Sequence, residues 1–526
     1  MKKGFTLIEL LAVIVILAII ALIATPIVVD IIEDSKNSSI RESVNMYKSA
    51  AENAIATSAM NDGLEDGTYI IDSKGNLKYK DKEIKVDIKN YNFESGILVI
   101  EQGQIKDIKL IQSDKVTTGK ELTKIDKWDG KTIKEVTEDS NGIYHITKAS
   151  ELAWVAQKVN SGETFEGKTI SLDASLDLGG RYDKDGNKLG TEWTPIGIKK
   201  SADEIFPFKG TFEGNNNVIS GIYINKPQDN SNENKYLGLF GYIDSAIINN
   251  LVIRDSYLKG YSLISTTCGA VANSSKINNI TVINTYLNVI RSSGIVIGAT
   301  STNVTLSNLY SYNGEITGNG TNIGGIVGLL QHQSSLNNAY SNSTVSNSST
   351  ETIAGTGGII GLMFSNEFAD NLVSEAKVIG LSDVGGIVGQ FQRGSKLTNS
   401  VSYAEVLGNN MVGGVVGVAS SYYGDCVLEN IKSYAKVTEK DSNTGVDLGG
   451  VIGRLSSGNT YLTNIYSKSN VNGKDRIGGI LGGFRENSET TLNYKNIISE
   501  STIKGETNVG NLWGYADSTS TINELN

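Results

Sequence analysis

The chain opens with an apolar stretch that passes into a segment with helical periodicity. Residues 5–29 are almost entirely apolar, which is long enough for a helix that spans a membrane. Beyond them, apolar side chains recur at spacings of three or four, at Ile40, Val44, Tyr47, Ala51 and Ile55. This period is typical of an amphipathic helix with one buried face. We therefore predict one long helix over residues 5–60, whose second half packs on a globular head.

The next segment changes to short runs in which apolar and polar residues alternate. Runs such as 84–88 and 97–100 are separated by Gly and Asp. Alternation of this kind predicts half-buried strands. Residues 61–138 are therefore expected to form a small β-rich head.

From residue 236 onward one unit recurs with a period of roughly 30 residues, within the range of solenoid proteins. Its first mark is Gly-apolar-apolar-Gly, which begins at Gly238, Gly325, Gly358, Gly386, Gly414, Gly450 and Gly479. Its second mark is an asparagine in step with the glycines, at Asn250, Asn279, Asn308, Asn338, Asn371, Asn399, Asn430, Asn464 and Asn496. A fixed period indicates units that stack on one another as coils.

The residues after each asparagine indicate which side chains face inward. Positions one, three, five and seven after it are usually apolar, serine, small and valine, as at Ile431, Ser433, Ala435 and Val437. Because side chains alternate along a strand, these four positions share one face. Such inward ladders predict a parallel β-helix of about ten coils, expected to be right-handed. The asparagines should then form a row of hydrogen-bonded side-chain amides at equivalent turns.

Residues 139–235 precede the regular repeats and are expected to form the cap and first coils of the solenoid. A segment with the period of an amphipathic helix contains Leu152, Trp154, Val155 and Val159, and this helix should cover the first edge. The runs at 168–172 and 208–214 look like first coils. The expected fold class is mainly β with a long N-terminal helix.

Composition agrees with ordered β structure and disfavours some partners. The 526 residues include 58 Gly and only 4 Pro, which suits tight turns and uninterrupted strands. The net charge is −10, and no basic cluster follows the first three residues, so nucleic acid is not an expected partner. Cys268 and Cys426 lie five repeats apart, or about 25 Å along a solenoid. That separation is too large for a disulfide, and we predict two free, buried thiols.

The carboxylate of Glu9 is an anomaly within the apolar N-terminal stretch. An unpaired charge in the membrane is energetically unfavourable, so Glu9 needs a cationic partner. Cleavage after Gly4 would create one, since the new amino terminus on Phe5 of a neighbouring helix could pair with Glu9. The run Gly-Phe-Thr-Leu-Ile-Glu at residues 4–9 resembles the type IV prepilin motif, which type II secretion pseudopilins share.

This resemblance implies how the chain is processed and displayed. In that family a membrane prepilin peptidase cuts after the glycine and methylates the new terminus, which places processing at Gly4 and Phe5 and assembly at Phe5 and Glu9. Pro26 falls where many members have a helix-weakening proline. The implied parts are a leader at residues 1–4, a transmembrane and assembly helix at 5–60 and a pilin-type head at 61–138. The precursor is expected in the cytoplasmic membrane, and the mature subunit in an extracellular filament with other pilin subunits.

The repeats resemble the GLUG repeat of large bacterial surface proteins, adhesins and some surface proteases. That resemblance implies an adhesin-like solenoid over residues 236–526. The sequence contains no His-Glu-x-x-His and no Gly-x-Ser-x-Gly motif, the usual marks of a zinc protease and a serine hydrolase. His145 and His332 are expected to be structural or exposed. We therefore expect no catalytic site, no metal and no cofactor.

Outward positions, two and four residues after each asparagine, are the best candidate face for a glycan or protein ligand. They carry Tyr310, Tyr312, Tyr340, Tyr403, Lys432, Tyr434, Tyr466 and Lys468. Ordinary stacking of tyrosines between coils explains the same pattern equally well.

Three functions stay open on this sequence. We favour a pilin-like subunit whose solenoid attaches to a host, a surface or a neighbouring cell. One alternative is a displayed β-helical enzyme that acts on polysaccharide, and another is a pseudopilin of a secretion or DNA-uptake system.

Overall fold

The computed structural model describes most of the chain after the N-terminal apolar stretch. The described residues are 35, 38–60, 63–80, 82–89, 91–112, 115–118, 123–201, 203–351, 354–486 and 488–525. Gly4, Phe5, Glu9 and Pro26 therefore lie outside them. Within the described residues, none of the helices is long and apolar enough to cross a membrane. The chain divides into two compact units, Met1–Ile125 and Asp126–Asn526.

The first unit combines the helix over residues 38–60 with an antiparallel sheet of seven strands. The strand order is β3-β2-β1-β4-β5-β6-β7. The strands are β1 (Gly67–Ile71), β2 (Leu77–Tyr79), β3 (Lys82–Ile84), β4 (Ser95–Glu101), β5 (Gln104–Gln112), β6 (Lys115–Thr117) and β7 (Thr123–Lys124).

One face of this helix is buried, as its period predicts. Its five periodic residues, Ile40, Val44, Tyr47, Ala51 and Ile55, are at most 8% exposed. The Tyr47 hydroxyl donates to the carbonyl of Gly75 at 2.8 Å, and its ring lies 5.3 Å from that of Tyr91. The prediction that this half of the helix packs on a β-rich head is confirmed.

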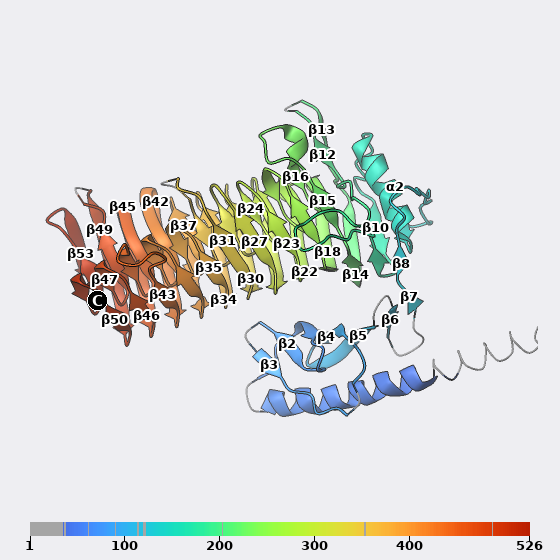
Figure 1. Ribbon diagram of the computed structural model, residues 1–526, viewed down its shortest axis with the longest axis horizontal. Coiled ribbons are helices and arrows are strands. Elements are labelled where there is room, and N and C mark those ends of the chain that lie inside the picture. The colour runs from blue at the N-terminus through green and yellow to red at the C-terminus, as the bar shows by residue number, and fades with distance from the viewer. Residues whose placement is uncertain are drawn as a thin grey trace, which may run out of the picture. The chain divides into compact units, whose positions relative to one another are not determined.

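The second unit is a β-solenoid whose coils stack along one axis (Figure 1). One coil runs through β22 (Lys276–Ile283), β23 (Tyr286–Asn288), β24 (Ser293–Gly294) and β25 (Ile297–Thr300). The next coil begins with β26 (Thr305–Tyr312), which pairs in parallel with β22. Strands equivalent to β23 form a ten-stranded sheet from β15 (Tyr223–Asn225) to β50 (Thr502–Lys504). Strands equivalent to β24 form an eight-stranded sheet that ends at β51 (Thr507–Gly510).

The solenoid has about 13 turns, so the expectation of about ten was too low. The additional coils lie before the regular repeats. There β9 (Ile143–Ile146), β10 (Thr169–Leu172) and β14 (Thr211–Ser220) pair in parallel, and β8 (Asp126–Lys127) pairs with β11 (Leu176–Asp177). The sequence prediction missed some of these coils because they lack the recurring asparagine and the Gly-apolar-apolar-Gly unit. The pairing of β8 also places residues from Asp126 onward in the solenoid unit.

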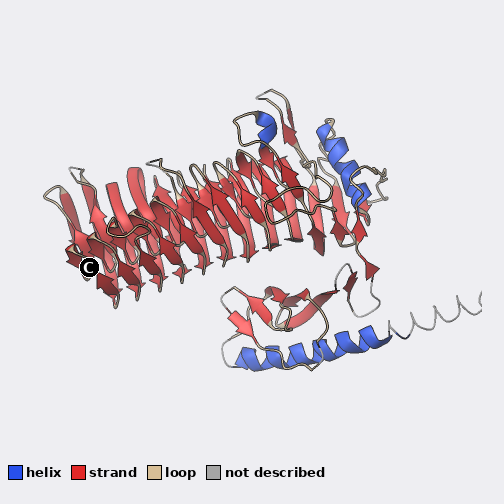
Figure 2. Ribbon diagram, viewed as in Figure 1, coloured by secondary structure: helices blue, strands red, loops and turns tan. Residues whose placement is uncertain are grey.

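Helix α2 (Ala149–Asn160) covers the first coils of the solenoid, and Figure 2 shows it at the end of an otherwise almost entirely stranded unit. Leu152, Val155 and Val159 are at most 1% exposed and belong to the same apolar cluster as the interior of the coils. At its start, the Glu151 carboxylate accepts the backbone N–H of Lys148 at 2.9 Å, which satisfies an N-terminal donor of the helix. The predicted cap is confirmed.

Eight of the nine repeated asparagines lie at a bend inside a strand rather than at its start, and Asn399 lies between β38 (Lys396–Thr398) and β39 (Val401–Ser402). All nine have a φ between +48° and +60°, a left-handed conformation that asparagine tolerates better than most residues. In β22 the pairing with β26 passes over Asn279, and Ile277, Ile280 and Val282 all point inward with 0% exposure. The bend thus lets side chains two before and one after the asparagine both face the core.

The asparagine amides hydrogen-bond from coil to coil, as predicted. The Nδ2 of Asn279 donates to Oδ1 of Asn250 at 2.8 Å, and Asn464 donates to Asn430 at 2.9 Å. At two coils the acceptor is the residue before the neighbouring asparagine, since Asn308 donates to Asn278 and Asn399 to Asp370, each at 2.7 Å. The row is therefore a structural ladder.

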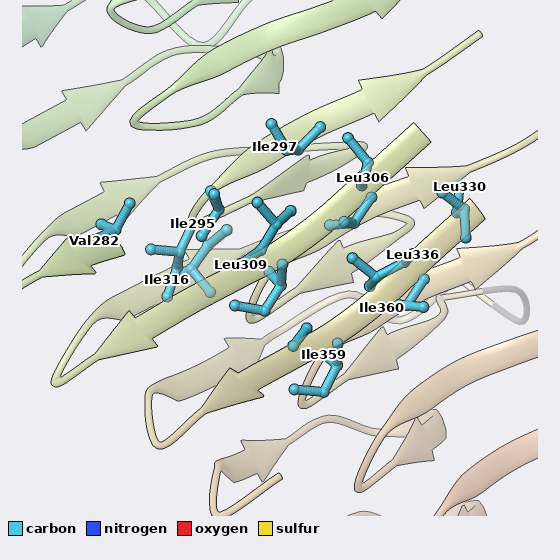
Figure 3. Packing of buried hydrophobic residues seen from close by; sticks show 14 of the residues in the cluster. Val282, Ile295, Ile297, Leu306, Leu309, Ile316, Leu330, Leu336, Ile359 and Ile360 are labelled. Atoms are coloured by element: carbon cyan, nitrogen blue, oxygen red, sulfur yellow. The ribbon is translucent and has the colours of Figure 1, made fainter. Parts of the chain in front are cut away.

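Apolar ladders fill the interior of the coils. Figure 3 shows Leu306 on β26 and its register partner Leu336 on the next strand, β30 (Ser335–Ser341), with Leu309 farther along β26. The inward serines and valines after each asparagine are also buried, and Ser433 hydrogen-bonds to Ser469 at 2.9 Å. Cys268 and Cys426 are both free and buried, which confirms that prediction.

The first glycine of each Gly-apolar-apolar-Gly unit lies directly against the backbone of the next coil. A Cβ added to Gly386 would be 2.1 Å from the carbonyl oxygen of Gly414, and one added to Gly414 would be 2.2 Å from that of Gly450. No side chain fits at such a distance, so these glycines set how closely the coils approach.

Gly386→Ala is expected to lower the free energy of unfolding by about 3 kcal/mol, because the added methyl group overlaps a backbone atom that cannot move alone. Thermal unfolding followed by circular dichroism measures the change. Lys377→Ala, at an exposed position of the same coil, is the control and should melt like the wild type. An unchanged melting temperature for Gly386→Ala would contradict the close backbone contact.

Candidate functional site

The tyrosines of the predicted ligand face divide into a buried and an exposed group. Tyr310, Tyr312 and Tyr340 are only 1–3% exposed, whereas Tyr403 and Tyr434 are 43% and 37% exposed. Outward rings on adjacent coils stand close enough to cover one another, as Tyr312 and Tyr340 do with ring centroids 5.2 Å apart. The exposed part of the face is therefore limited to the later coils.

The two exposed tyrosines direct their ring faces at each other. Tyr403 and Tyr434 stack with centroids 5.2 Å apart and planes 9° apart, and the half-buried ring of Tyr466 continues this tyrosine column at 5.8 Å from Tyr434, tilted by 56°. The stacked pair therefore presents ring edges and hydroxyl groups outward. That geometry supports stacking between coils more directly than it supports a platform for a ligand.

Charges beside this column are also paired between coils. Glu500 accepts the Tyr466 hydroxyl at 2.9 Å and lies 3.5 Å from the ammonium of Lys468. The hydrogen bond from its hydroxyl to Glu500 raises the pKa of Tyr466. Lys432 is exposed on the coil before it. A ligand role for this face stays a prediction.

A second bend in each coil produces a hollow that the sequence reasoning missed. Two residues before a glycine at an equivalent position of the coils, the backbone is again left-handed, at Asn322, Asp383, Met411, Asp447, Arg476 and Asn508 among others. Across three of these coils the surface forms a groove of 740 Å³, which Thr350 and Glu351 of the preceding coil and Arg485 of the following coil also line. It crosses β36 (Ser382–Gly385), β37 (Val388–Gln392), β41 (Asn410–Gly413), β42 (Val416–Ser433) and β45 (Ile452–Ser467).

Hydrogen-bonding side chains dominate the groove. Its lining includes the amides and hydroxyls of Gln390, Gln392, Asn409, Asn410, Ser382, Ser420 and Ser456. Charged groups stand among them, with Asp383 and Glu351 opposed by Arg454 and Arg485. The charges of these four side chains balance, so the groove offers many donors and acceptors without a net charge.

Asp383 is the most strongly perturbed acid in the groove. It is 2% exposed and accepts the amide of Gln390 at 2.6 Å, and Gln390 in turn accepts from Gln392 at 2.9 Å. Burial raises the pKa of Asp383 to about 6, although these hydrogen bonds and the charge of Arg454 act in the opposite direction. The three side chains form a hydrogen-bonded row from the buried acid to the groove surface.

Asp447 anchors the other side of the groove. Its carboxylate is fully buried and ion-pairs with Arg454 and with Arg476, whose Nε lies 2.8 Å from Oδ1. Burial raises the pKa of Asp447, and the two guanidinium groups oppose that shift. Arg454 also donates to Asn410 at 3.2 Å, so Asp447 fixes the guanidinium that lines the groove.

This groove is invisible to a search for repeated residue types, because the second bend uses a different residue in almost every coil. The signal that could have located it is positional. The bend residue precedes a Gly-Gly pair by two positions at Asn322, Asp383, Met411, Asp447 and Arg476.

The remaining chemical groups do not form a second centre within the described part of the chain. The Nδ1 of His145 lies 2.6 Å from a carboxylate oxygen of Asp173, and its Nε2 lies 3.5 Å from one of Asp139. Hydrogen bonds to these carboxylates raise the pKa of His145. The described residues contain no group of three or more His, Cys, Asp or Glu that could hold a metal ion.

Asp383→Asn is expected to change how stability depends on pH. The folded state raises the pKa of this carboxyl from 3.8 to about 6, so the folded protein binds the proton more tightly and its free energy of unfolding falls as the pH rises from about 4 to above 6. An amide cannot ionise and avoids this loss, which is about 2–3 kcal/mol at pH 7.5. Melting temperatures at pH 4.5 and 7.5 should differ less for the variant than for the wild type.

Glu506→Gln, at an exposed carboxylate, is the control for that experiment and should follow the wild type at both pH values. Equal pH dependence for Asp383→Asn and the wild type would contradict a buried titrating acid.

Comparisons with known proteins identify the start of the chain. No curated protein matches the chain in sequence. A Bacteroides ovatus protein, provisionally assigned as an immunoglobulin A1 protease, matches 72% of this chain and 87% of its own at 16% identity and a TM-score of 0.35. The catalytic domain of a GH87 α-1,3-glucanase, solved with nigerose, matches 88% and 86% at 10% identity and a TM-score of 0.24. Both similarities are too low to bear on activity. Residues 1–25 match the prokaryotic N-terminal methylation motif, so this chain joins a prepilin-type N-terminal motif to a β-solenoid of about 13 turns.

Proposed function

We propose that this protein is a type IV pilin-like subunit that displays its solenoid as an adhesive surface on a filament. The methylation motif at residues 1–25 supports processing by a prepilin peptidase and assembly with other pilin subunits. The amphipathic helix over residues 38–60, packed on a small antiparallel sheet, is the arrangement expected of a pilin body. The solenoid then accounts for most of the mass that a filament would present.

Assembly is proposed to depend on one ion pair between subunits. After cleavage behind Gly4, the Glu9 carboxylate of one subunit would meet the amino terminus of Phe5 on its neighbour. Each group removes the cost of leaving the other unpaired in an apolar surrounding. This pairing would select subunits that have been cleaved.

The observation that carries the binding role is the row of hydrogen-bonding groups in the groove across three coils. Side-chain amides, hydroxyls and a guanidinium together offer donors and acceptors in many directions, and Leu381, Met411 and Val418 add apolar surface. A hydroxyl-rich, uncharged ligand such as a neutral glycan fits this chemistry best. We therefore place the adhesive site in the groove rather than on the tyrosine column.

The same geometry supports binding more than cleavage. Glycoside hydrolysis usually needs two available carboxyl groups. Here Asp383 and Asp447 lie two coils apart, roughly 10 Å at the usual strand spacing, and two arginines occupy Asp447. We propose that the solenoid is a binding module and not an enzyme.

Glu9→Ala tests the assembly role. We expect normal cleavage after Gly4 and a loss of nearly all incorporation into filaments, because the new amino terminus loses its partner. Immunoblots of sheared filaments and of membranes measure both steps. Glu33→Ala, a carboxylate beyond the apolar stretch, is the control. Normal incorporation of Glu9→Ala into filaments would contradict the proposed ion pair. Antibody labelling of the wild-type protein only in a secretion or DNA-uptake complex would argue against a filament subunit.

Gln392→Ala combined with Arg485→Ala tests the groove. Loss of two hydrogen-bonding groups should weaken binding of a neutral glycan at least about tenfold, measured by calorimetry on a ligand chosen from a glycan array. Tyr403→Ser combined with Tyr434→Ser is the matched control and should bind normally. The reverse result would move the site to the tyrosine column. Release of shorter sugars during incubation would instead indicate an enzyme.

A further inference from the structure

The longest coils of the solenoid lie near its capped end and carry inserted segments. Thr169 of β10 pairs with Thr211 of β14, 42 residues later. In the regular repeats the interval is shorter, since Ile247 pairs with Lys276, 29 residues later. The insertions contain the hairpin of β12 (Ile198–Lys199) and β13 (Ile205–Phe206) and the short helix η1 (Asn232–Asn234). Figure 1 shows β12, β13 and β16 (Lys235–Leu237) on the same side of the first coils. Insertions in repeat proteins commonly gather on one face, which is often the binding face.

These inserted segments enclose a pocket of 720 Å³ with an apolar base, a size suited to a small molecule. Trp193, Pro195 and Leu237 line it and are themselves buried, and Ile198 is half-buried. The indole N–H of Trp193 donates to the carbonyl of Leu239 at 3.2 Å, so this ring is held in place by the next coil.

Lysines surround the pocket and outnumber its acids. Lys199, Lys200, Lys226 and Lys235 line it, against Glu192 and Glu233. The chain as a whole carries a net charge of −10. A local excess of positive charge in an acidic protein focuses a favourable potential on an anion at that place.

Two of these lysines have no carboxylate partner among the described residues. Lys226 pairs with Glu192 at 3.0 Å, and Lys200 pairs with Glu204 at 3.0 Å. The ammonium of Lys199 instead lies over two rings, 5.7 Å from the centroid of Tyr236 and 5.5 Å from that of Tyr242.

Lys235 is the second lysine without a carboxylate. Its ammonium lies 5.8 Å from the ring of Tyr261 and 3.5 Å from the amide oxygen of Asn232. Lys199 and Lys235 are both half-buried. The aromatic rings hold both ammonium groups at the pocket and leave their charge uncompensated.

We infer that this pocket binds a carboxylated sugar, with its carboxylate between Lys199 and Lys235 and its ring against the apolar base. Ammonium groups form strong hydrogen bonds with carboxylates, and the C–H face of a sugar ring suits an apolar surface. The pocket shares no lining residue with the groove, so this second site goes beyond the proposed adhesive function and does not depend on it.

Short oligogalacturonate is the probe for this site, used with the full chain in detergent, and its methyl ester is the matched uncharged ligand. We expect the acid to bind, the ester to bind at least about tenfold more weakly, and binding of the acid to weaken as salt increases. Lys199→Gln combined with Lys235→Gln should reduce binding of the acid about a hundredfold, since each removes a charge-assisted hydrogen bond.

Two variants make the outcome specific. Lys504→Gln removes an exposed lysine on a distant coil, and Gln392→Ala alters the groove, so both should leave binding of the acid unchanged. Equal binding of the acid and the ester, an unaffected double variant, or tighter binding of a polyglutamate peptide than of the sugar would each overturn the assignment. Circular dichroism of the double variant should match the wild type, because both lysines lie at the rim of the pocket.

Discussion

Parallel backbone pairing between successive coils is the interaction on which the solenoid depends. Each strand bonds to its counterpart roughly 30 residues away, so every position in one coil meets the same position in the next. A side chain is therefore tolerated only if it fits against copies of its own kind. Glycine meets the carbonyl of the following coil at Gly386 and Gly414 because no larger residue fits there, while valine and serine stack inside. The sequence repeats because the backbone does.

Two left-handed bends in each coil serve different purposes. At the first bend almost every coil uses asparagine, which tolerates the backbone conformation and bonds to the amide of the neighbouring coil. At the second bend the residue type varies, and side chains such as Asp383 and Asp447 reach partners on the strands beside them. The asparagine that recurs at the first bend stabilises the stack of coils. The varied chemistry of the second gives individual coils a surface of their own.

Charged side chains that are withdrawn from water make this surface unfavourable to form in terms of free energy. Asp447 has no exposed surface and needs two arginines from different coils to offset its desolvation. Lys199 lies against two tyrosine rings instead of a carboxylate. Arrangements of this kind stabilise the fold less than apolar side chains would. Both occur where the coil outline is hollowed.

Local periodicity was sufficient to predict much of the fold. The buried face of the helix over residues 38–60, the cap formed by α2, the inward ladders, the asparagine ladder and the two free cysteines all follow from spacing along the chain. The number of coils did not, because the first coils lack the repeated marks. The tyrosine face was only partly accessible, since an outward side chain such as Tyr310 can still be covered by its surroundings.

By itself, the sequence determined the prepilin-type start, the repeating coil and which side chains point into it. These properties depend on neighbours a few residues apart or one period apart. Only the tertiary structure decided where the solenoid is hollow and which charges remain uncompensated. Those properties depend on segments without a common pattern, as when Arg454 reaches Asn410 in a different coil or Lys226 pairs with Glu192 across an insertion. Stacking brings such residues together, and no spacing in the chain encodes their contact.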